Sequence, residues 1–131
     1  MKAVFVLGRL LFGGFFLYNG INHLKSRAAL TPYAQAKGIP SPDLAVPASG
    51  ALLIAAGTSI VLGLRPKLGA LGTVGFLAAA SFGMHDFWNA DDPGQSQNDM
   101  IHFSKNMALL GAALALMSVE EPWPVSLGRK S

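Results

Sequence analysis

Residues 44–64 read LAVPASGALLIAAGTSIVLGL and contain no Asp, Glu, Lys or Arg. A second charge-free stretch, LGALGTVGFLAAASFGMH, runs from 68 to 85. An apolar run of roughly 18 residues or more is long enough, as a helix, to cross the ~30 Å hydrocarbon core of a bilayer. A helix that is apolar on every side has no face to present to water. These two stretches therefore predict membrane-spanning helices.

Two flanking segments are apolar but interrupted by polar residues. The clean runs 10–18 and 107–119 would reach only about 14 Å and 20 Å as helices, so their polar ends must enter the membrane as well. We therefore predict an all-α fold, a transmembrane four-helix bundle forming a single membrane domain over 1–131, with spans at about 3–24, 44–64, 67–88 and 99–119. A cleavable signal peptide is disfavoured for the first segment because Arg9 breaks it. A soluble helical bundle is disfavoured more strongly than a signal peptide.

Composition agrees with a membrane protein and excludes several classes. Hydrophobic residues make up 51% of the 131 residues and charged residues 13%, which is too apolar for a disordered chain. There is no cysteine, which excludes a disulfide scaffold, thiol redox chemistry, iron–sulfur clusters and thiolate zinc sites. The basic residues are spread along the chain, so no nucleic-acid partner is expected.

The distribution of basic residues predicts the orientation. Four spans place both termini on one side of the membrane, and that side carries the larger share of the basic residues: Lys2, Arg9, Arg65, Lys67, Arg129 and Lys130. The opposite side carries Lys25, Arg27 and Lys37 in its loops, with Lys105 in the fourth span. The positive-inside rule then favours cytoplasmic termini in a bacterial-type inner (plasma) membrane.

Local signals refine the loops and the packing faces. Thr31-Pro32 and Gly38 predict a short interfacial helix over 32–37 in the first outer loop, and Ser96 to Asp99 has capping-box spacing before the fourth span. Trp123 is expected at the inner interface. Small residues recur every four positions in two spans, which predicts either packing within the bundle or a homodimer face: Gly75, Ala79 and Gly83, then Ala108, Ala112 and Leu116.

Polar residues gather at the outer ends of three spans. By parity, all three histidines of the chain fall there, together with amides, one lysine and one carboxylate: Asn19, Asn22, His23, His85, Asp86, His102, Lys105 and Asn106. Polar groups at membrane depth are costly and should face the bundle interior. We therefore predict a hydrated or hydrogen-bonded pocket near the outer leaflet, with Lys105 paired to Asp86 or Asp99.

The pocket has several interpretations at this point. Its residues could only hold the helices together, or they could supply donors to a polar head group such as a quinone carbonyl or a lipid head. A metal on His23, His85 and His102 is a weaker alternative, because each ligand comes from a different helix. No covalent cofactor or haem is expected. Arg9, at the opposite end, is expected to reach anionic lipid headgroups.

Two segments resemble a known family. The run from Gly8-Arg9-Leu10-Leu11-Phe12 to Asn19-Gly20-Ile21-Asn22-His23-Leu24 resembles the first span of the DoxX family, and residues 101–111, IHFSKNMALLG, resemble its last span. The resemblance implies a small integral membrane protein with four spans. Its name-giving members resemble a subunit of a thiosulfate:quinone oxidoreductase, and other members are linked to membrane-bound oxidoreductase complexes. No catalytic residue set is available to carry over.

Three functional hypotheses follow. The first is an accessory subunit of a quinone-linked membrane redox system, in which His85, His102 and Lys105 donate hydrogen bonds or protons and Asp86 orients them. Its electrons would come from a membrane-bound oxidoreductase partner. The second is a non-enzymatic scaffold or assembly factor, and the third is a small-molecule transporter. The last is weakened because the sequence shows no inverted repeat.

Overall fold

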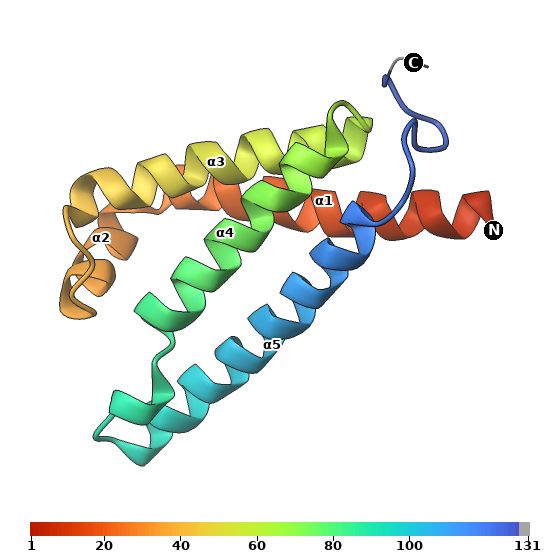
Figure 1. Cartoon of the computed structure of the whole chain (residues 1–131). Coiled ribbons are helices and arrows are strands. Elements are labelled where there is room, and N and C mark those ends of the chain that lie inside the picture. The colour runs from red at the N-terminus through yellow and green to blue at the C-terminus, as the bar shows by residue number, and fades with distance from the viewer. Residues whose placement is uncertain (129–131) are drawn as a thin grey trace.

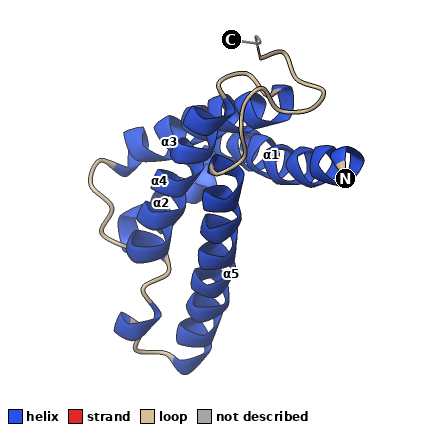
Figure 2. Cartoon of the chain, turned by 45° about the vertical axis from the view of Figure 1, so that its right-hand side comes forward, coloured by secondary structure: helices blue, strands red, loops and turns tan. Residues whose placement is uncertain are grey.

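The computed structural model describes residues 1–128 and contains five α-helices and one short 3₁₀ helix in that range. The helices are α1 (Lys2–Lys25), α2 (Arg27–Ala36), α3 (Pro42–Leu62), α4 (Pro66–Met84), η1 (Phe87–Asn89) and α5 (Pro93–Met117). Four of these segments are long and apolar enough to cross a membrane. No strand is present in residues 1–128 (Figure 2). The predicted all-α fold with four spans is confirmed, and the chain is a multi-pass membrane protein.

The spans pack as two antiparallel pairs. α1 lies along α3, α4 lies along α5, and the pairs meet where α3 contacts α4. They converge near the two chain termini and diverge at the opposite end, where α2 lies across the opening (Figure 1). Both termini therefore lie at the same end, as the number of spans predicted. The orientation of that end in a membrane stays a prediction, and two of the basic residues behind it, Arg129 and Lys130, lie outside the described residues.

Prolines and glycines set the helix boundaries. Pro42, Pro66 and Pro93 occupy the first turns of α3, α4 and α5, where a missing N–H costs nothing. Gly38 has φ +75° after α2, and the bond from the Ile39 amide to the Ala34 carbonyl is 3.1 Å. This is a Schellman stop, so the predicted role of Gly38 is confirmed.

Two predicted helix starts are wrong. The helix in the first outer loop begins at Arg27, not near residue 32, because the Thr31 hydroxyl donates to the Arg27 carbonyl at 2.7 Å and does not cap a new helix. α5 begins at Pro93 because the Asp92 carboxylate accepts from the Gln95 amide at 2.8 Å. The predicted capping box therefore lies inside α5, where the Ser96 hydroxyl donates to the Phe87 carbonyl.

Glycine pairs allow α1 and α3 to approach closely. Gly13 faces Gly57, and Gly20 faces Gly50, in antiparallel register. A Cβ built on Gly57 would lie 2.7 Å from the Gly13 carbonyl oxygen, which is shorter than a van der Waals contact. Small residues let membrane helices pack backbone to backbone. The helix pair α1 and α3 forms the core, together with the buried side chains of Phe16, Leu53 and Leu77.

The predicted packing of the small residues of α4 and α5 within the bundle is largely wrong, and the alternative of a homodimer face stays a prediction. Nothing lies within 4 Å of a Cβ built on Gly75, and Ala79, Ala108 and Ala112 are exposed. Gly83 does pack, against the Ile39 side chain. The spacing in the sequence identified small residues correctly but could not tell which of them meet another helix.

Candidate functional site

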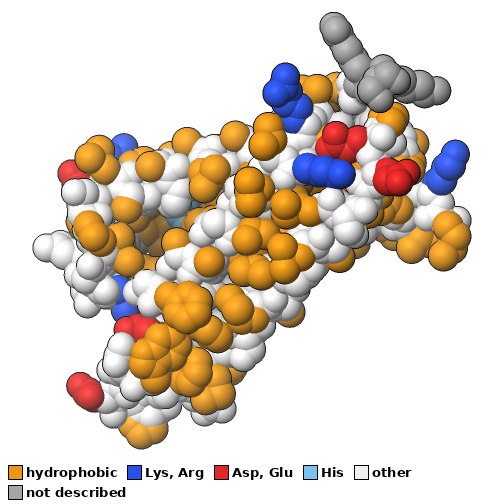
Figure 3. Space-filling view, in the orientation of Figure 1, with side chains coloured by type: hydrophobic (Ala, Val, Ile, Leu, Met, Phe, Trp, Pro, Cys, Tyr) orange, Lys and Arg blue, Asp and Glu red, His pale blue; other side chains and the backbone are white. Residues whose placement is uncertain are grey.

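A cavity of about 510 Å³ opens between the two helix pairs at the end opposite the termini. Its lining comes from all five α-helices. Figure 3 shows histidine atoms in the hollow between α3 and α4. The cavity brings together all the predicted cluster residues except Asp86: Asn19, Asn22, His23, His85, His102, Lys105 and Asn106.

The rest of the cavity wall is mostly apolar. Phe16, Val46, Phe76, Leu77 and Met84 line it from α1, α3 and α4. On the α2 side the lining consists of Leu30, Tyr33 and Ala34. A mostly apolar cavity with a few convergent polar groups is the usual form of a small-molecule site, and its volume lies in the range typical of such sites.

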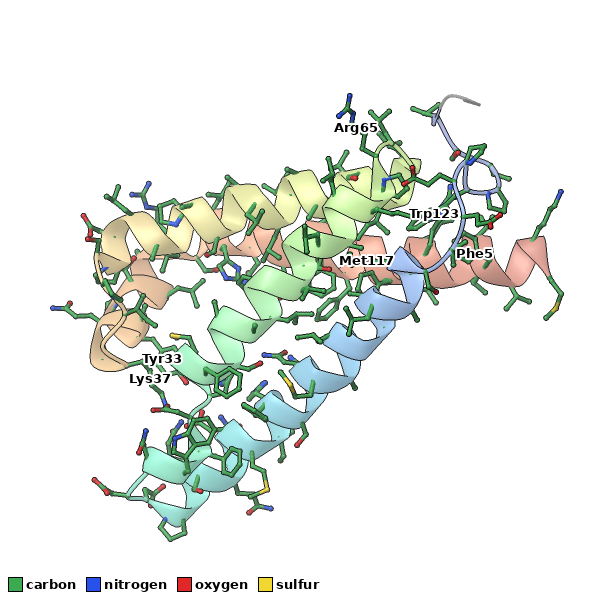
Figure 4. The ribbon with its side chains drawn as sticks, viewed as in Figure 1. Phe5, Tyr33, Lys37, Arg65, Met117 and Trp123 are labelled. Atoms are coloured by element: carbon green, nitrogen blue, oxygen red, sulfur yellow. The ribbon has the colours of Figure 1, made fainter. Side chains whose placement is uncertain are left out.

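The carboxylates pair with a lysine that the sequence analysis did not include in the cluster. Lys37 Nζ, in the loop after α2, donates to Asp99 Oδ2 at 2.8 Å and to Asp86 Oδ1 at 3.3 Å. Asp99 is 0% exposed and also accepts from Gln95 Nε2 at 3.1 Å. The predicted pairing of Lys105 with Asp86 or Asp99 is wrong. α2 folds back over the open end, so that Lys37, and not Lys105, lies beside the two carboxylates (Figure 4).

Lys37 stays charged in this arrangement. Burial lowers the pKa of Lys37, but its hydrogen bonds to Asp99 and Asp86 outweigh burial and hold that pKa above its ordinary value. We call Lys37, Asp86 and Asp99 the ionic clamp. It links α2, the junction between α4 and η1, and α5.

The three histidines are not grouped around one point. The His85 and His102 rings stack with centroids 4.9 Å apart, and His85 Nδ1 lies 3.4 Å from Asp99 Oδ1. His23 Nδ1 instead contacts the Asn19 carbonyl at 2.7 Å, and its ring packs edge-on to Phe76. No group of three metal-ligating side chains lies close enough to hold a metal within residues 1–128. The alternative of a three-histidine metal site is therefore contradicted.

Five polar side chains lining the cavity form no hydrogen bond with protein among residues 1–128: Tyr33, Asn98, His102, Lys105 and Asn106. Asn106 is 6% exposed, which makes it the most buried residue of the five. Lys105 Nζ lies 5.9 Å from the centre of the Phe15 ring. Of the five, His102, Lys105 and Asn106 are spaced i, i+3 and i+4 on α5, which places them on one helix face, so these three side chains are available together to one ligand.

Arg9 does not reach lipid headgroups as predicted. It is 2% exposed, and its guanidinium donates to the carbonyls of Pro124 and Val125 and, at 3.4 Å, to that of Val61. Trp123 is also covered by protein and does not face the interface, with its ring 5.3 Å from Phe5. Phe5 and Trp123 lie together where the tail after α5 crosses α1 (Figure 4). Arg9 therefore anchors the tail.

Comparison with known families identifies the chain. The DoxX family model matches residues 4–86, which include α1, α2, α3 and α4. The chain belongs to the DoxX family. The matched part of this DoxX protein ends before α5, so the resemblance seen at 101–111 lies beyond it. No curated protein and no solved structure matches the chain.

Sequence reasoning missed Lys37 and Gln95 of this DoxX protein, and it named Asp99 as a possible partner of Lys105 without including it in the cluster. Gln95, Asp99, His102 and Asn106 follow one another at spacings of four, three and four residues, which places them on one helix face. If the start of the helix had been predicted at the Asp92-Pro93 cap, this face would have been recognised in the sequence. Lys37 carries no comparable signal, because it lies in a loop 62 residues away from Asp99 in the sequence.

Proposed function

We propose that this DoxX-family protein is an accessory subunit of a quinone-linked membrane redox system and holds an amphipathic ligand in the cavity between its helix pairs. The observation that carries the proposal is the cavity itself: about 510 Å³, mostly apolar, and containing the unpartnered side chains of His102, Lys105 and Asn106. These three side chains can donate hydrogen bonds to a quinone carbonyl. The apolar wall suits the isoprenoid tail.

The role of each residue follows from its contacts. Asn106 and His102 bind the head group, and His85, stacked on His102 and close to Asp99, orients that ring. Proton transfer to a reduced head group would use the imidazoles. The side chains of this cysteine-free chain supply no electron carrier, so electrons come from a partner subunit.

The test is quinone binding by purified protein in nanodiscs. Mass spectrometry identifies co-purifying quinones, and titration with decylubiquinone measures affinity. The double variant His102→Ala/Asn106→Ala is expected to bind at least about 10-fold more weakly, because two buried hydrogen bonds are lost. Ser104→Ala is the matched control, since Ser104 is exposed on the same helix and does not line the cavity.

Two results would contradict the proposal. One is wild-type protein that neither retains a quinone nor binds decylubiquinone. The other is a double variant that binds decylubiquinone as tightly as the Ser104→Ala control. Circular dichroism melting of each variant in the same nanodiscs establishes that the fold is retained.

A scaffold role is the second candidate, and one observation favours it. α5 exposes the small residues Ala108, Gly111 and Ala112 away from its partner α4, and such surfaces can receive another membrane helix. Because the chain has no cysteine, the single cysteine of Ala112→Cys can report contact with a second copy of the variant through disulfide crosslinking in membranes. A crosslinked product with Ala112→Cys, and none with the exposed Val4→Cys on α1, supports docking at this surface. Equal crosslinking at both positions contradicts it.

A further inference from the structure

Lys105 is an unpaired cation in the middle of a membrane-spanning helix. It is the central residue of α5 (Pro93–Met117), and no carboxylate lies within 4.0 Å of its ammonium group in residues 1–128. Its only specific contact there is the Phe15 ring. A charged side chain at the centre of a membrane-spanning helix costs about 2.5–3.5 kcal/mol on insertion scales. Such a residue calls for a partner that offsets this cost.

The cavity beside Lys105 contains no protein anion. Lys105 is the one formally charged side chain among the described residues that line it, and no Asp or Glu lines it. The carboxylates of Asp86 and Asp99 bind Lys37 in the ionic clamp. The free side chains of His102 and Asn106 can each donate a hydrogen bond, and the positive charge of Lys105 beside them has no anionic partner among the described residues that line the cavity.

Lys105 also lies at an entrance. It is exposed, and so is Phe15, although both line the cavity. α1 and α5 are not one of the closely packed helix pairs. Between them, a ligand can enter sideways from the membrane, passing its head group along Lys105 before it reaches the amide of Asn106.

We propose that the cavity takes an amphiphile with an anionic head group, bound by Lys105 and Asn106, with its tail against Phe76, Leu77 and Val46. The inference rests on the proposed function, in which the cavity holds an amphipathic ligand, and adds amphiphiles with a negatively charged head group to the ligands that this cavity binds. An anion pairs with the ammonium through charge-assisted hydrogen bonds, which are about twice as strong as neutral ones. A neutral head leaves the charge of Lys105 uncompensated.

The experiment compares two probes that differ only in head charge. Tritiated dodecanoate is bound to the wild-type protein in phosphatidylcholine nanodiscs at pH 8, with empty nanodiscs as background, and is competed by unlabelled dodecanoate or dodecanol. Wild type is expected to prefer dodecanoate by at least about 10-fold. Lys105→Met is expected to remove this preference, because dodecanoate then binds no more tightly than dodecanol, whereas Lys105→Arg retains it. Lys25→Met is the matched control, because Lys25 is exposed at the end of α1 and does not line the cavity.

The outcomes separate this inference from the proposed function. Decylubiquinone binding with no preference for dodecanoate over dodecanol overturns the inference and leaves the proposed function standing. Failure to bind dodecanoate, dodecanol and decylubiquinone overturns both. A preference that survives in Lys105→Met also overturns the inference, and Lys105→Gln repeats the comparison if the methionine variant does not fold.

Discussion

Lys37 Nζ lies 2.8 Å from Asp99 Oδ2, across the open end of the two helix pairs. Lys37 follows a short helix in the first outer loop, and Asp99 lies in the last span. The contact holds α2 against the end of the molecule where the pairs diverge. It also removes Asp99 from the list of groups that a ligand in the cavity could use.

Asp99→Asn should destabilise the protein by about 3 kcal/mol, since removing one partner of a buried ion pair leaves the other charge uncompensated. Asp99 is 0% exposed, whereas Asp91 is exposed, so Asp91→Asn serves as the matched control. The free energy of unfolding is measured by circular dichroism during titration with sodium dodecyl sulfate. Equal stability of the two variants would show that the ionic clamp does not contribute to the fold.

Alkaline pH should weaken the same contact. The pKa of Lys37 is higher in the folded protein than its ordinary value of 10.5. Its contribution to stability is therefore complete below that ordinary value and declines as the pH rises through the folded pKa. The unfolding midpoint of wild type should fall more steeply than that of Lys37→Met above about pH 10.5. Parallel pH profiles for the two proteins would refute the assignment.

Gly57→Ala should destabilise the α1–α3 pair by about 1–3 kcal/mol, the usual cost of overpacking. The new Cβ would lie 2.6 Å from the Leu17 amide nitrogen and 2.7 Å from the Gly13 carbonyl oxygen. Gly75→Ala is the control, because nothing lies within 4 Å of its Cβ and alanine favours a helix. Thermal unfolding of both variants in detergent measures the difference, and a loss for Gly75→Ala as large as for Gly57→Ala would argue against the close approach.

Arg9→Met should release the tail after α5 and cost about 2 kcal/mol, because buried carbonyls lose their donor. Trp123 is 2% exposed, and its fluorescence reports the release. In a Trp88→Phe background, which leaves a single tryptophan, acrylamide should quench Trp123 more strongly in the Arg9→Met variant. Lys2→Met, changed at an exposed position of the same helix, should leave quenching unchanged. Unchanged quenching in Arg9→Met would rule out the anchoring role.

The amino-acid sequence by itself determined the class of protein, the number of spans and the end at which the histidines gather. These properties depend on local quantities: the length of apolar runs, the helical rise and the parity of crossings. Most of the polar residues that line the cavity from α1, α4 and α5 could be predicted from such local quantities as well. A polar residue inside an apolar span is directed inward by the cost of exposing it to lipid.

Only the tertiary structure decided which charges pair. Lys37 and Lys105 are both basic residues within reach of the end where the helix pairs diverge, and their sequence positions do not rank them as partners for Asp99. The choice depends on α2 folding back over the diverging helix pairs, which brings Lys37 to Asp86 and Asp99 and leaves Lys105 facing Phe15. The hydrogen-bond partners of Arg9 were also decided by the tertiary structure, because the carbonyls that accept from it lie far away along the chain. Pairing energies fall steeply with distance, and distances between remote residues exist only in the folded molecule.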